Sequence, residues 1–365
     1  MSSVLGEHIY AAFAPPRFLA FPFSGIDVSA SSVKAVRLSE SVHGLVLAGH
    51  SEKYLPSGTY LDGEVVDSSA VSKVIVAAAE AAGISDANVA LSESKSFLFE
   101  TTVSGITPNE WRVEIEQHLD ELIPLPPQEA VFDVVDVGKK GEKGTLVAGA
   151  GFAKRIVDET LSVFDQVGIR VRSLEGETFA MARALLPRGD NSTTLIIDIG
   201  KTTTKISIVE ERIPRFATTI GIGGHSLTLA VQKHFGVTEE EARKIKVERG
   251  IVPAPGNDDY LATMLSTVSA IRDEIGVRLN YWQSKEARIN NHEPVSAGIL
   301  VGGNASVRGL PEYLEGALKI PITTGDVFSN LAPRDTWVPS LEYAESLAYT
   351  TAVGLALRDH VQSYA

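Results

Sequence analysis

The sequence predicts an α/β protein built from two similar halves. Strand-like and helix-like segments are mixed along the whole chain, which is typical of that class. Residues 26–34 recur as residues 197–205: in both copies apolar residues lead into an Asp, small or hydroxyl residues follow, and a Lys stands seven positions after the Asp. Because internal repetition usually reports duplicated architecture, the repeat predicts two matched sheets. A length of 365 residues suits two domains of ordinary size.

The composition is that of a folded globular protein, with 44% hydrophobic and 22% charged residues. A formal net charge of −13 argues against general nucleic-acid binding, which needs a positive field. Without cysteine, disulfides, thiolate catalysis and cysteine-ligated metals are excluded. No segment reaches the roughly 18 apolar residues that cross a bilayer. Residues 1–22 are interrupted by prolines and Arg17, so we expect a loosely held arm; a weak membrane or partner contact is the alternative.

In the first half, hydrophobic periodicity predicts strands and helices in alternation. Thr107 and Glu110 form a capping box that starts a helix, and Gly83 and Gly168 end the helices before them. The expected elements are strands within 23–47, a helix at 71–82, a strand at 88–91, a helix from 108 to the prolines at 124–127, paired strands at 131–137 and 145–152, a helix at 154–167, a strand at 171–174 and a helix at 178–186.

The second half restarts the same pattern. Residues 260–284 carry the longest helical periodicity, with the apolar residues on one stripe. Thr238 is the expected N-cap of the highly charged helix before it. The expected elements are hairpin strands within 194–209, a strand at 215–220, helices at 226–235, 238–249 and 260–284, a strand at 295–301 and a small-residue helix at 341–357.

The two repeated segments are the best candidates for a binding site. Each predicts a strand, a tight turn and a returning strand. An Asp in a single turn usually bonds its local backbone, but two facing hairpins would bring Asp27, Asp198 and two sets of amides to one point. That point suits a polyphosphate with Mg²⁺, because amides bind phosphate oxygens and carboxylates hold the ion through its waters. The candidate phosphate contacts are Ser29, Ser31, Ser32, Lys34, Gly200, Lys201, Thr202 and Thr203.

Two glycine loops follow further predicted strands. One precedes the helix at 226–235, where N-terminal amides can receive an anion; the other follows the strand at 295–301. For each, the alternative is a turn that bulkier residues cannot make. Two cations three positions apart on the charged helix share a face, either toward a sugar and base or toward solvent. These candidates are Gly223, Gly224, Arg243, Lys246, Gly302, Gly303 and Asn304.

These motifs resemble the actin-like ATPase superfamily. That resemblance implies two duplicated sheet-and-helix domains around a nucleotide cleft, with ATP and Mg²⁺ as cofactors. The G-x-x-x-x-G-K-[ST] pattern is missing, since no glycine stands five residues before Gly200. The matching segments are 25–34 for the first phosphate motif, 195–209 for the second, 299–304 and 310–314 for the adenosine motif, and 177–185 and 346–357 for the two connecting helices.

Within the superfamily, the chain resembles the PilM family of type IV pilus assembly proteins, which is related to the cell-division protein FtsA. Residues 119–124 with 129–133 resemble the inserted PilM subdomain, and the Gly-Gly loop at 223–224 with Lys246 is seen in both families. The implied organisation is an arm at 1–22, a first domain at 23–187 with an inserted subdomain at about 88–172, a second domain at 188–358 with a smaller subdomain at about 236–294, and a tail at 359–365.

Two positions depart from the family pattern. Lys201-Thr202 stands where small residues are usual, and Arg243 stands where a Glu commonly touches the ribose. An amphipathic C-terminal membrane helix of the FtsA type is not expected, which favours PilM. We identify no residue that positions water, so no catalytic residue is assigned and enzymatic activity stays open, at most a slow ATPase.

The resemblance implies an ATP-binding scaffold at the cytoplasmic face of the inner membrane. Its expected partner is the N-terminal cytoplasmic segment of PilN. By resemblance, the inserted subdomain packs beside the first-domain sheet and leaves a groove, where we expect this peptide to place apolar side chains in pockets and form main-chain bonds to an exposed edge. Self-association through that insertion is the alternative. An FtsA-like division filament, or a kinase or ATPase of the same superfamily, are the competing functions.

Overall fold

The computed structural model describes residues 23–141, 144–284 and 292–362, and the expected N-terminal arm lies outside them. The first sheet begins with the predicted meander, whose three strands pair antiparallel, and continues through two parallel strands in the order β10-β6-β1-β2-β3. Buried Ile26 and Val89 lie at the parallel β1–β6 contact. Its strands are β1 (Phe23–Val28), β2 (Ser32–Ser41), β3 (Gly44–Tyr54), β6 (Asp86–Leu91) and β10 (Arg170–Gly176).

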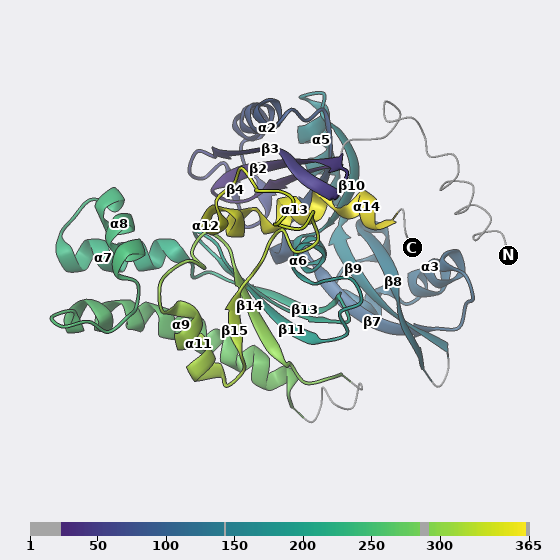
Figure 1. Cartoon of the computed structure of the whole chain (residues 1–365). Helices are drawn as coiled ribbons and strands as arrows, with labels where there is room; N and C mark the ends of the chain where they lie inside the picture. The colour runs from purple at the N-terminus through teal and green to yellow at the C-terminus, as the bar shows by residue number, and fades with distance from the viewer. Residues whose placement is uncertain (1–22, 142–143, 285–291, 363–365) are drawn as a thin grey trace.

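The second sheet has the same topology as the first. An antiparallel meander is again extended by two parallel strands, in the order β13-β12-β11-β14-β15. The predicted duplication is therefore visible as two copies of one sheet, which lie above and below the connecting helices in Figure 1. Its strands are β11 (Thr193–Ile199), β12 (Thr204–Glu210), β13 (Ile213–Ile220), β14 (Ala297–Val301) and β15 (Ile322–Thr324).

A third, separate sheet of order β7-β9-β8 is inserted into the first half and has its own core around Trp111 and Phe132. The inserted segment is shorter than the expected 88–172, because β6 and β10, at the two ends of that range, both pair within the first sheet. The expected single helix from 108 to the prolines divides into two near His118. The elements are β7 (Phe97–Val103), β8 (Ala130–Gly141), β9 (Gly144–Ala153), α3 (Pro108–Glu116) and α4 (Leu119–Leu122).

Helices cover the sheets and extend the second half. In the first half, Asp67 accepts from the amide of Ala70 to start α2, and Gly83 ends it at φ 69°. In Figure 1, α7, α8 and α9 project to the side of the second sheet. No helix of the described segments is long and apolar enough to cross a membrane. The bounds are α2 (Ser68–Ala82), α5 (Lys154–Asp165), α7 (Gly224–Phe235), α8 (Glu239–Arg249), α9 (Asp258–Trp282), α11 (Leu310–Leu318) and α14 (Arg358–Gln362).

Two helices join the halves, α6 (Glu177–Leu185) and α13 (Thr350–Ala356), and they cross closely. Gly354 permits the approach, because a Cβ there would overlap the carbonyl oxygen of Ala180. The helix expected at 341–357 is interrupted: α12 (Tyr343–Ser346) leads into a 3₁₀ turn before α13. The Leu347 carbonyl accepts the amide of Gly302 at 2.9 Å, so a tertiary contact bends this segment.

Candidate functional site

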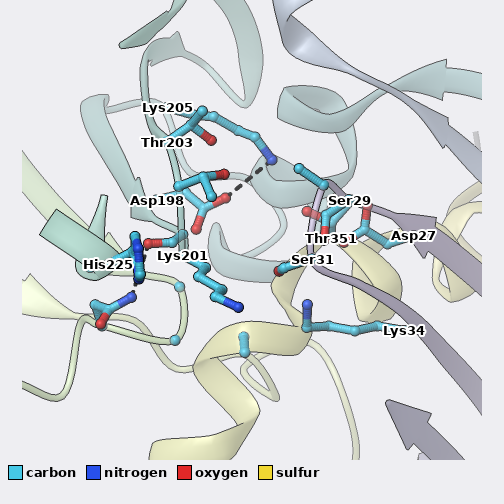
Figure 2. A pocket seen from close by; sticks show the side chains of 18 of the residues that line it. Asp27, Ser29, Ser31, Lys34, Asp198, Lys201, Thr203, Lys205, His225 and Thr351 are labelled. Carbon is cyan, nitrogen blue, oxygen red and sulfur yellow. Dashed lines mark hydrogen bonds and ion pairs between the residues drawn. The ribbon is translucent and has the colours of Figure 1, made fainter. Parts of the chain in front are cut away.

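The two hairpins face each other across a cavity of about 390 Å³ (Figure 2). Both halves and the connecting helices line it. Of the predicted contacts, Ser32 and Gly223 lie behind the lining, where Ser32 accepts from Lys34 and Gly223 precedes α7. The predicted residues that line the cavity are Asp27, Ser29, Ser31, Lys34, Asp198, Gly200, Lys201, Thr202, Thr203, Gly224, Arg243, Lys246, Gly302, Gly303 and Asn304.

Both hairpins use the same local geometry. In the first turn the Ser29 amide donates to the Ser32 carbonyl at 3.0 Å, and in the second the Gly200 amide donates to the Thr203 carbonyl at 2.9 Å. The strand register places Asp27 opposite Lys34, and Asp198 opposite Lys205. The repeated spacing of seven residues thus becomes a repeated cross-strand pair of acid and base.

Asp27 is buried without a full set of partners. Its side chain is 5% exposed, and its Oδ1 has no hydrogen-bond partner among the described residues. Burial, and next the negative charge of Glu177, raises the pKa of Asp27 to about 6. A buried carboxylate oxygen without a donor needs an external one, such as a metal-bound water. This observation fits a metal–polyphosphate ligand in the cavity.

Asp198 lies on the opposite side of the cavity in Figure 2 and pairs with a lysine. Its Oδ2 is 3.5 Å from Lys205 Nζ, which also donates to Glu177 Oε1 at 2.7 Å. The negative charges of Glu177, Asp198 and Asp27 outweigh burial and hold the pKa of Lys205 above its usual range. This partly buried ammonium, on a side chain that is 15% exposed, therefore lies among three carboxylates and partly neutralises them.

Two other lysines reach the cavity differently. Lys34 pairs with Glu52 at 3.3 Å and donates to Ser32 Oγ at 2.8 Å, so its charge is already partly compensated. Lys201 is exposed, and its side chain points into the space between Asp198 and Lys34 (Figure 2). Its ammonium is thus placed to meet an anionic ligand.

The amides of the first glycine loop do not have the anion-binding role that was predicted for them. The amides of Gly224 and His225, at the start of α7, already donate to the carbonyls of Gly200 and Lys201 at 2.9 and 2.7 Å. They hold the second hairpin, at residues 197–205, in place and are not free to receive an anion. Gly224 is required by packing, because a Cβ there would overlap the side chain of Asn304.

The second glycine loop lies against the metal-site candidate. A Cβ at Gly302 would overlap Asp198 Oδ1, and its φ of 92° is unfavourable for other residues. Asn304 donates through Nδ2 to the Gly200 carbonyl at 2.9 Å and accepts from Lys246 through Oδ1 at 2.7 Å. The loop therefore braces the hairpin that carries Asp198.

The two cations on α8 have separate environments. Lys246 is 6% exposed, and its Nζ donates to the Gly224 carbonyl, Thr228 Oγ1 and Asn304 Oδ1. Burial lowers the pKa of Lys246 to about 8. Arg243 lies at the cavity rim and pairs with Glu239 at 2.8 Å. Lys246 therefore holds the walls together, and Arg243 is the better placed of the two for a ligand.

The sequence patterns did not indicate several residues of the lining. Glu177 begins α6, Tyr60 comes from the short hairpin of β4 (Tyr60–Leu61) and β5 (Glu64–Val65), and Thr351 comes from α13. Their positions depend on how distant elements pack. The one available signal was an acidic residue in the first turn of a predicted helix: Glu177 follows Gly176 at the start of α6.

Comparisons with known proteins agree with this arrangement. A family model described as type IV pilus assembly protein PilM matches residues 25–360. The solved PilM–PilN type IV pilus biogenesis complex has a TM-score of 0.73 at 19% identity, covering 92% of this chain and 97% of that one. MreB5 of Spiroplasma citri bound to ADP has a TM-score of 0.56 at 13% identity, covering 94% and 98%. These likenesses confirm the predicted actin-like fold.

Cell division protein FtsA of Neisseria meningitidis serogroup B is 23% identical over 271 residues, which are 64% of this chain. The match spans 62% of the length of FtsA. The family model, in contrast, extends over nearly the whole described chain, from the first hairpin to α14. The predicted family is confirmed: this chain belongs to the PilM family of type IV pilus assembly proteins.

Proposed function

We propose that this protein is a nucleotide-binding scaffold of type IV pilus assembly. It binds ATP with Mg²⁺ between its halves and works at the cytoplasmic face of the inner membrane, where it binds the N-terminal segment of PilN. Family membership supports the pilus role, and nucleotide-bound MreB5 on the same fold supports the ligand. The observation that carries the nucleotide proposal is the buried, unpartnered Asp27 Oδ1 in the cavity between the hairpins.

Each part of the ligand has residues that suit it. Asp27 and Asp198 would hold the waters of Mg²⁺, which neutralises phosphate charge when bound. The hydroxyls and amides of Ser29 and Thr203, with the Lys201 ammonium, would take phosphate oxygens. The rim near Arg243 would face the sugar and base. With the predicted domains at 23–187 and 188–358, this site would lie between the two.

Calorimetry of Mg²⁺-ATP binding tests the nucleotide proposal. Asp198→Ala should weaken binding at least about tenfold, because it removes one of two carboxylates from the metal position. Asp158→Ala, an exposed change on α5 away from the cavity, is the matched control and should bind like the wild type. Equal affinities of Asp198→Ala and the wild type would refute the proposal.

The inserted sheet offers one open edge for a peptide. Its β7 edge meets the second sheet, where Arg215 pairs with Glu100 at 2.5 Å, whereas β8 pairs only with β9 among the described strands. Val131 and Val135 on β8 are 40% and 42% exposed. We infer that the PilN segment adds along β8, with main-chain bonds to its edge and apolar contacts to these valines.

A synthetic peptide of the PilN N-terminal segment tests this site. The cost of ordering the peptide should keep the affinity near micromolar, about −8 kcal/mol. Val135→Asp should weaken binding at least about tenfold, whereas Val277→Asp, at a 61% exposed position on α9, should not. Similar losses in both variants, or none, would place the partner elsewhere.

A further inference from the structure

Lys201 differs from the other lysines of the cavity lining because its charge is not compensated. Lys34 and Lys205 each pair with a glutamate, at 3.3 and 2.7 Å, and Lys246 donates to three oxygens of the cavity wall. Lys201 is exposed and has no ion pair within 4 Å in the described part of the chain. Its ammonium is therefore available to a ligand, whereas the charges of the other three are already used within the protein.

The backbone at Lys201 is held firmly although the side chain is exposed. Its carbonyl accepts the amide of His225 at 2.7 Å. The carbonyl of the preceding Gly200 accepts the amide of Gly224 and the side-chain amide of Asn304, both at 2.9 Å. These bonds fix the point from which the side chain extends. A ligand that meets the ammonium therefore orders one side chain and not the loop that carries it, which lowers the entropic cost of the contact.

The direction of the side chain brings the ammonium to the phosphate position of the proposed site. In Figure 2 it extends into the space between Asp198, from the second half, and Lys34, from the first. An ion held near Asp198 and the ammonium of Lys201 would both supply positive charge to the same phosphate oxygens. The ammonium is part of the chain, so it remains when the ion is absent.

We infer that Lys201 is a specificity-determining residue that lets the cavity hold a nucleoside triphosphate whose phosphates carry no metal ion. This inference rests on the proposed nucleotide site and names a second form of its ligand. With a small residue at position 201, metal-free phosphates would face Asp27 and Asp198 beside lysines that are already paired, and repulsion between like charges would weaken binding. Lys201 thus reduces the dependence of nucleotide binding on Mg²⁺.

A lysine that only stabilised the turn would behave differently. Its replacement would lower the free energy of unfolding and weaken ATP binding by the same factor with and without Mg²⁺. A lysine that contacts phosphate matters more when the ion is absent, because no other uncompensated cation then meets the same oxygens. The ratio of the ATP dissociation constants in EDTA and in MgCl₂ therefore separates the two roles.

Calorimetry of ATP binding by the full chain, in MgCl₂ and in EDTA, measures this ratio. Lys201→Ser should weaken ATP binding at least about tenfold in EDTA, as expected for a lost hydrogen bond between charged groups, and at most about threefold in MgCl₂. Lys201→Arg keeps the charge and should resemble the wild type. Lys244→Ser removes the same charge from a 67% exposed side chain on α8 outside the lining and should change neither affinity. Equal losses in both conditions, or the same loss in Lys244→Ser, would overturn the inference.

Inorganic tripolyphosphate gives a second measurement that involves neither sugar nor base. In EDTA it should bind Lys201→Ser at least about tenfold more weakly than the wild type, and equal affinities would show that the lysine does not contact phosphate. Urea unfolding of Lys201→Ser should match the wild type, since the side chain is exposed. Wild-type protein that binds ATP in MgCl₂ but not in EDTA would overturn this inference alone. Failure to bind ATP in MgCl₂ would instead refute the proposed function.

Discussion

Replacing Asp27 with Asn should stabilise the nucleotide-free protein while weakening its binding of Mg²⁺-ATP. Asp27 is 5% exposed, and burial and Glu177 raise its pKa from 3.8 to about 6. Its ionised form is therefore disfavoured in the folded state. Such a cost is retained where a charged group serves a ligand, as often occurs at functional sites.

The magnitude and the pH range follow from this shift. A rise of the Asp27 pKa from 3.8 to about 6 corresponds to about 3 kcal/mol of folding free energy. Below pH 3.8 both folded and unfolded states are protonated at Asp27. As the pH rises from about 4 to about 6, the unfolded state releases its proton first, so folding is progressively penalised. Above about pH 6 the full cost of about 3 kcal/mol applies.

Urea unfolding in EDTA at pH 4.5 and pH 8 measures this cost. The stability advantage of Asp27→Asn over the wild type should be much larger at pH 8, up to about 3 kcal/mol. Asp198→Asn is the matched control, because its carboxylate has Lys205 at 3.5 Å and its neutralisation removes an ion pair. The reasoning would be wrong if Asp27→Asn gave no stability gain at pH 8, or if Asp198→Asn gave the same gain.

Three further changes test individual packing and polar contacts by urea unfolding. Gly354→Val should lower the free energy of unfolding by about 2 kcal/mol or more, because the new side chain would overlap the backbone of α6. Gly316→Ala on α11, where an added Cβ has nothing within 4 Å, should be neutral or raise it by about 0.5 to 1 kcal/mol. Lys246→Met should cost about 2 kcal/mol and weaken nucleotide binding, because three acceptors lose one donor. Arg215→Met should cost about 3 kcal/mol, since its side chain is 1% exposed between two glutamates, and Glu100→Gln, at a 20% exposed position, clearly less.

The duplicated fold was predictable because its signal is local. Each hairpin is a continuous segment, so the seven-residue spacing from Asp to Lys specifies its turn and its register. Helix capping is equally local: the capping box at Thr107 and the left-handed glycine after α2 both occur as predicted. The break before α13 was not predictable, because it depends on Gly302 donating to a carbonyl 45 residues further along the chain.

The lining of the cavity was predicted better than its interactions. The hydroxyl and glycine patterns of the turns correctly predicted many of the residues that line the cavity, because a hairpin turn is one continuous segment whose residues lie together in space. The hydrogen-bond partners of the lining residues depend on tertiary packing. No sequence spacing links Lys205 to Glu177, and none indicates that Lys246 donates to Asn304 within the protein. The sequence also placed the inserted segment at 88–172, because local patterns cannot assign β6 and β10 to the first sheet.

The internal charge pairs indicate how the proposed site would balance the charge of a polyphosphate. Lys34 is compensated by Glu52 and Lys205 by Glu177, whereas exposed Lys201 has no ion pair within 4 Å in the described part of the chain. A polyphosphate at the proposed site would therefore meet Lys34 and Lys205 already paired with carboxylates, and its own metal ion would balance much of its charge. In the proposed function, affinity would then depend on Mg²⁺ held between Asp27 and Asp198, one from each half. A ligand bound in this way ties the two halves together, which is what a scaffold needs from a nucleotide.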